Sequence, residues 1–147
     1  MESRLGLISK NLAHQLSHTD EKTLRNLTWA TGKAALTYTK IRNSLVERFL
    51  DAAEGRCPAD LPSFRQELLN YVEELDALQW NLREDVDQGK IAVSDYLQAF
   101  ADARVFNALY FALDPDPHIA AAESIYETVT ASNDLPALEE LVRKIIG

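Results

Sequence analysis

The sequence has little cysteine, glycine and proline, and each shortage excludes a class of protein. The single cysteine, Cys57, cannot form an internal disulfide, which excludes disulfide-stapled scaffolds and suits a reducing compartment. Five glycines and five prolines in 147 residues are too few for a low-complexity or disordered chain. Because the glycines are scattered, they form neither a GxxxxGK nor a GxGxxG phosphate-binding loop.

Long hydrophobic runs are also missing. No stretch approaches the roughly 18 apolar residues of a membrane-spanning helix. The first twenty residues lack the continuous apolar segment of a secretory signal peptide. We therefore expect a soluble cytoplasmic protein without a membrane partner. The length of 147 residues fits one helical domain, 1–147, with a substantial hydrophobic core.

Apolar residues recur at spacings of three and four along almost the whole chain, whereas no long stretch alternates with period two. This pattern predicts an all-α fold. Asp60, Asp116 and Asp134 each precede a proline by one or two residues, as is typical of a capped helix start. Gly55 and Gly89 are suited to helix ends. The predicted helices span residues 2–17, 20–54 (bent at Gly32), 61–88, 94–113, 117–131 and 135–146.

The segment 94–113 is apolar nearly all round, which indicates a helix covered on several sides. We therefore expect a single-domain antiparallel bundle of five or six helices around this helix. Helices 20–54 and 61–88 would form its long hairpin. Two polar residues interrupt the apolar surface of 94–113, Arg104 and Asn107. Arg104 requires a partner, because burying an unpaired charge is very costly. The partner is either a carboxylate of another helix or a ligand in a cavity that both residues line.

The predicted helix 61–88 carries an acidic face opposite its core stripe. A tryptophan stands among carboxylates on this face, and tryptophan is enriched at the centres of protein interfaces. The charge is also uneven, with eight Lys/Arg and four acids in residues 1–50 but seven Lys/Arg and nineteen acids in residues 51–147. This asymmetry favours a basic protein partner and disfavours nucleic acid. The residues of the predicted partner-binding face are Leu69, Glu73, Asp76, Trp80, Glu84 and Asp87.

A second tryptophan, Trp29, lies with Leu36 opposite the core stripe of 20–54, near basic residues such as Arg25 and Lys33. The Trp29 and Trp80 faces are therefore complementary in charge. We expect them to pack together within one chain, and the alternative is contact between two copies in a homodimer.

Motifs for metals, cofactors or catalysis are weak or absent. His14 and His18 have the i, i+4 spacing of metal ligands but lack an obvious third ligand. The acids of 61–88 include two ExxD elements, yet both lie on one helix and no EExxE element accompanies them. Cys57 has no histidine near it in sequence, and no GxSxG motif occurs. We expect no cofactor, no metal and no catalytic residue. The stretch Asp114–His118 is interpreted as the connection that ends one helix and starts the next.

These features favour a non-enzymatic protein-binding module that docks a basic protein through its acidic helix face. One alternative is a small-molecule-binding or enzymatic bundle in which Arg104 and Asn107 line a cavity, and another is a structural homodimer. In size, acidity and helical content the chain resembles small bacterial partner-binding proteins, such as toxin-neutralising immunity proteins and adaptors. That resemblance rests on composition and covers no motif.

Overall fold

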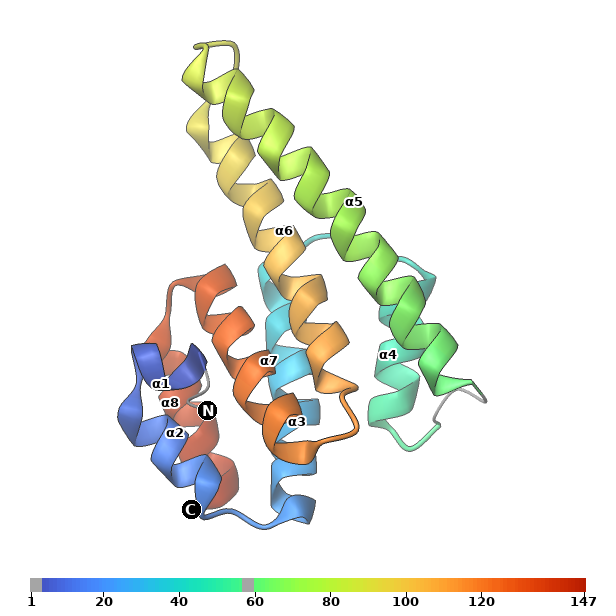
Figure 1. The fold of residues 1–147 in the computed structure, drawn as a ribbon, viewed down its shortest axis with the longest axis vertical. Coiled ribbons are helices and arrows are strands. Elements are labelled where there is room, and N and C mark those ends of the chain that lie inside the picture. Colours follow the sequence, from blue (N-terminus) through green and yellow to red (C-terminus); the bar gives the residue numbers. More distant parts are fainter. Residues whose placement is uncertain (1–3, 57–59) are drawn as a thin grey trace.

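The computed structural model describes residues 4–56 and 60–147, and this part of the chain is helical without any strand. Cys57 lies outside the described residues. The chain begins with two short helices and continues through two further helices into a long hairpin. Its last two helices then pack beside the first ones, and together these helices form the body of the molecule (Figure 1). The helices are α1 (Arg4–Ile8), α2 (Lys10–Ser17), α3 (Glu21–Ala35), the 3₁₀ turn η1 (Leu36–Tyr38), α4 (Ser44–Ala53), α5 (Leu61–Asp87), α6 (Val93–Ala112), α7 (Pro117–Ser132) and α8 (Leu135–Ile146).

The predicted helix 2–17 is divided at Ser9. This residue is extended, with φ −156° and ψ 100°, and its hydroxyl accepts a hydrogen bond from the Leu12 amide. Serine is a strong N-cap because its side chain satisfies an otherwise unpaired amide of the first turn. The chain therefore starts a new helix, α2, at Lys10.

The prediction of one helix over 20–54 is wrong. The helix stops at Ala35, passes through η1, and the chain is non-helical from Thr39 to Asn43. One contact from outside the segment and two within it hold this break. The Thr39 hydroxyl donates to the Asp102 carboxylate of α6 at 2.7 Å, and Arg42 donates to the nearby carbonyls of Leu36 and Ile41. Asn43 then caps α4 by accepting from the Val46 amide. Leu36, expected on an outer face, is buried in the core.

Gly32, where the sequence suggests a bend, allows a close contact between α3 and α4. A Cβ atom at this position would lie 2.3 Å from Cζ of Phe49. Phe49 is fully buried, and its ring lies 5.6 Å from that of Trp29. The absence of a side chain at Gly32 is therefore what lets the Phe49 ring pack against the backbone of α3.

The expected helix starts at Asp60, Asp116 and Asp134 are confirmed. Each aspartate accepts a hydrogen bond from an amide in the first turn of the helix that follows it. In the stretch Asp114–His118, Asp116 caps α7 by accepting from the amides of His118 and Ile119. This stretch therefore connects two helices, as expected. The predicted helix 94–113 is α6, which begins one residue earlier, at Val93, with no side-chain cap.

The core lies mainly in the body of the molecule. One cluster joins α3, α4, α5 and the second half of α6, and another joins α1, α2, α3, α7 and α8. Within α6, Ala103, Phe106 and Leu109 are completely buried. Its first turns are not, since Val93 and Leu97 are 57% and 54% exposed.

The long hairpin consists of α5 and α6, not of residues 20–54 and 61–88 as expected. Figure 1 shows the tip of this hairpin extending well beyond the other helices. The turn at the tip follows Gly89, whose φ of +73° is a conformation that glycine adopts readily. In the described part of the chain, no helix has the length and apolarity required to cross a membrane.

Substitution Gly32→Ala tests the close approach of α3 and α4. Alanine is favoured over glycine inside a helix by about 1 kcal/mol, so a site with free space would be stabilised. Here we expect a loss of about 1–3 kcal/mol in the free energy of unfolding, because the new methyl group overlaps the Phe49 ring. Urea denaturation measures the change.

The Phe49→Leu background is the control, since it removes the overlapping ring atoms. In that background the same Gly32→Ala change should be neutral or stabilising. Equal losses in both backgrounds would show that the Phe49 ring is not the constraint.

Candidate functional site

A buried carboxylate, Glu127 of α7, lies where α1, α6 and α7 meet. Its side chain has no exposed surface. It accepts hydrogen bonds from Arg4 at 2.8 Å, from Arg104 at 3.0 Å and from the Asn107 amide at 2.9 Å. Two cations and one amide thus compensate a charge that would be very costly to bury alone.

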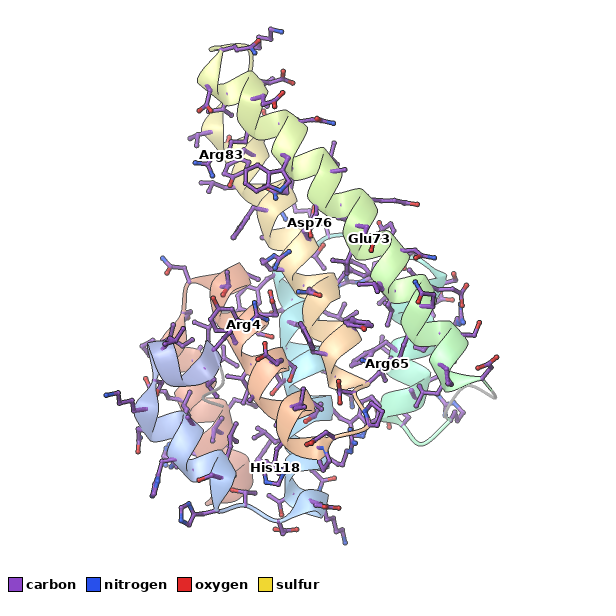
Figure 2. All side chains as sticks on the ribbon, in the orientation of Figure 1. Arg4, Arg65, Glu73, Asp76, Arg83 and His118 are labelled. Atoms are coloured by element: carbon purple, nitrogen blue, oxygen red, sulfur yellow. The ribbon has the colours of Figure 1, made fainter. Side chains whose placement is uncertain are left out.

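Arg104 extends this network to the hairpin. Its guanidinium donates to Asp76 of α5 at 2.8 Å as well as to Glu127. Arg104 therefore has carboxylate partners on two other helices, which is the interpretation that the sequence favoured over a ligand. Figure 2 shows Asp76 between α5 and α6.

Arg4 closes the network from the N-terminal side. It donates to Glu123 and Glu127, and its guanidinium lies 4.3 Å from the ring centroid of Tyr126. Burial alone would lower the pKa of Arg4, but the hydrogen bonds to Glu123 and Glu127 outweigh it and raise the pKa above its ordinary value. Arg4 therefore remains charged and ties α1 to α7.

An open groove of about 950 Å³ lies beside this network, between α2, α6 and α7. Asn107 lines this groove, but Arg104 does not. The sequence suggested that both residues could line one cavity, and the structure places only Asn107 there. His118, which Figure 2 shows at the lower end of the body, is exposed and also belongs to the lining. The other lining residues are Arg4, Ala13, Leu16, Ser17, Phe111, Ile119, Ala122 and Glu123.

The predicted partner-binding face lies on α5, from the body toward the hairpin tip. Trp80 is 58% exposed, which is a large exposed fraction for an indole. Glu73, Glu84 and Asp87 are exposed as well. The other two members differ: Leu69 is half-buried, and Asp76 is already bound to Arg104.

The expected packing of Trp29 against Trp80 within the chain is wrong. Trp29 contacts the core at Phe49 and lines a small cavity with Leu61, the first residue of α5. Trp80 follows Leu61 by nineteen residues, which is about 28 Å along a helix axis. The two indoles therefore lie near opposite ends of α5.

His14 of α2 and its C-cap residue His18 lie side by side. The rings of His14 and His18 lie 4.4 Å apart, and Nδ1 of His18 is 2.9 Å from the Ser17 hydroxyl. Within residues 4–56 and 60–147, no three His, Cys, Asp or Glu side chains are grouped as a metal ion would require. The ExxD acids of α5 also stay on one helix, as the sequence indicated.

The fold and site define an all-helical protein with a charge network at its centre and an acidic hairpin on its surface. No protein-family model, curated protein or solved structure matches the chain. The site is therefore interpreted from its own geometry.

Substitution Glu127→Gln tests the central network. The neutral amide keeps the shape but leaves Arg4 and Arg104 without their shared charge, so we expect unfolding to become easier by about 3 kcal/mol. The matched control is Glu123→Gln, one turn earlier, which removes a carboxylate bonded to Arg4 alone. Its expected cost is below about 1 kcal/mol, in the range of partly exposed pairs. Chemical denaturation compares the two, and equal costs would contradict a central role for Glu127.

Proposed function

We propose that the protein is a non-enzymatic binding module, of adaptor, regulatory or immunity type, that docks a basic protein partner on its α5–α6 hairpin. The observation that carries the proposal is the position of Trp80. It is 58% exposed on a hairpin that projects from the body, with exposed carboxylates before and after it on the same helix. The docking residues are Trp80, Glu73, Glu84 and Asp87.

Electrostatics supports a basic partner. Residues 73–98, which form the outer part of the hairpin, contain seven carboxylates and two cations. Such a field attracts a positively charged surface over several ångströms and accelerates its association. The exposed indole then supplies the desolvated contact that charge alone does not provide.

The same charge disfavours a homodimer in which the two hairpins pair with each other. Two copies joined through their hairpins would bring two acidic tips together, and like charges at an interface cost several kcal/mol. A partner of opposite charge satisfies the same carboxylates without this repulsion.

The proposed arrangement assigns different tasks to the two halves of the molecule. The bundle of five or six helices that the sequence predicts around residues 94–113 supplies a rigid base. Arg104 anchors the hairpin to that base through Asp76 and Glu127. A rigid hairpin loses little conformational entropy when it docks, which favours affinity.

A second candidate function, small-molecule binding, is favoured by the groove beside Asn107. Its volume of about 950 Å³ falls within the range of ligand sites. Arg104 does not contribute to this candidate, because its two carboxylate partners hold it in the network.

Substitution Trp80→Ala tests the proposed docking surface. The probe is a labelled amphipathic peptide of leucine and lysine, and a leucine–glutamate peptide of the same pattern serves as the negative control. We expect the basic peptide to bind at low ionic strength and Trp80→Ala to weaken it at least about tenfold, as for an interface hot spot. Fluorescence anisotropy measures the affinity.

Leu78→Ala is the matched variant. Leu78 is also exposed, at 48%, but lies two residues from Trp80 and therefore on the opposite side of α5. It should change the affinity by less than about twofold. Absence of binding, or equal losses in the two variants, would exclude Trp80 as the docking centre.

A further inference from the structure

Aromatic rings and arginines alternate along one side of the hairpin. The guanidinium of Arg83 lies 5.8 Å from the ring centroids of both Trp80 and Tyr96. Tyr96 lies 6.2 Å from Phe100, whose ring in turn lies 5.9 Å from the guanidinium of Arg104. The series thus crosses from α5 to α6 and ends at the buried charge network.

Arg83 lies equally near two rings that belong to different helices. It follows Trp80 by three residues, so the two side chains are neighbours on α5, and it reaches across to Tyr96 of α6. Figure 2 shows Arg83 nearer the tip of the hairpin than Asp76. At 5.8 Å, both contacts lie near the outer limit of about 6 Å for a cation–π interaction.

Arg83 is held weakly in other respects. It is exposed, and within residues 4–56 and 60–147 it takes part in no ion pair shorter than 4.0 Å. Arg104, by contrast, has two carboxylate partners at 2.8 and 3.0 Å. The hairpin therefore has one fixed arginine near the body and one loosely held arginine near its tip.

The surroundings of Arg83 suit a basic side chain from another protein. Glu84 and Asp87 are exposed and lie one turn after Trp80 and Arg83, at i, i+4 spacing. Val93 and Leu97, each more than half exposed, flank Tyr96 on α6 and add an apolar border. At an interface, an arginine stacks on aromatic rings and pairs with carboxylates, and the apolar residues next to it pack on aliphatic groups.

We propose that the partner inserts an arginine side chain between Trp80 and Tyr96 and displaces Arg83. This inference rests on the proposed function and specifies how the hairpin recognises its partner. In the free protein, Arg83 lies over both rings and also repels an incoming cation. In the complex, the partner's guanidinium stacks on both rings while Glu84 and Asp87 approach its charge.

Arginine suits this position better than lysine. The guanidinium is planar and weakly hydrated, so it stacks on ring faces with a smaller desolvation cost than an ammonium group. The guanidinium of Arg83 already lies within 6 Å of both ring centroids in the free protein, so a group of this shape can reach both rings.

The experiment compares Arg83→Gln with Lys90→Gln. Lys90 is the other cation of the outer hairpin and is exposed in the turn at the tip, so both variants remove one positive charge from the same region. The probes are hexa-arginine and hexa-lysine peptides of equal charge. Fluorescence anisotropy at low ionic strength gives their affinities for the wild-type protein, both variants and Trp80→Ala.

Arg83→Gln should bind hexa-arginine about threefold more tightly than Lys90→Gln does, because it also vacates the rings. The preference for hexa-arginine over hexa-lysine should increase in Arg83→Gln and disappear in Trp80→Ala. If binding depends on Trp80 but Arg83→Gln is no tighter than Lys90→Gln, displacement of Arg83 is wrong while the docking surface stands. If no peptide binding depends on Trp80, the docking surface itself fails.

Discussion

The buried carboxylate of Glu127 is the polar interaction that links the hairpin to the body of this protein. It joins Arg4 of α1 and Arg104 and Asn107 of α6 to α7, and Arg104 continues the connection to Asp76 of α5. Glu127 is the partner that both arginines share, so its removal would leave two cations without that charge. The position of the hairpin therefore depends on an interaction at the centre of the body.

The outer hairpin differs from the body in that it carries apolar side chains but has no neighbouring helices to bury them. Two helices cannot cover all of their own apolar surface, and Trp80, Val93 and Leu97 stay more than half exposed. Carboxylates around them keep the tip solvated and oppose self-association, and Arg83 partly covers the exposed rings. A surface of this kind would suit the basic, arginine-bearing partner that we propose.

The sequence predicts most helix ends because local chemistry sets them, as at Asp60, Asp116 and Asp134, where a capping carboxylate and a proline act within one turn. It misses the break at 39–43, because Thr39 is held there by Asp102, sixty-three residues away, while the apolar period continues unbroken. The sequence indicated that Arg104 needs a partner, but it did not indicate which carboxylates would be that partner. Glu127 and Glu123 are the two acids of α7, a helix otherwise rich in small and apolar residues, and acids in such a helix are the signal for a buried role.

The central claim is that the rings near the hairpin tip are open in the free protein and are covered by a partner. Acrylamide quenching of Trp80 fluorescence tests it most directly, in the Trp29→Phe protein where Trp80 is the remaining indole. The account predicts efficient quenching of the free protein, as expected for an indole that is 58% exposed. Quenching as weak as that of a buried tryptophan would show that Trp80 is already covered, which would contradict an open docking surface on the hairpin.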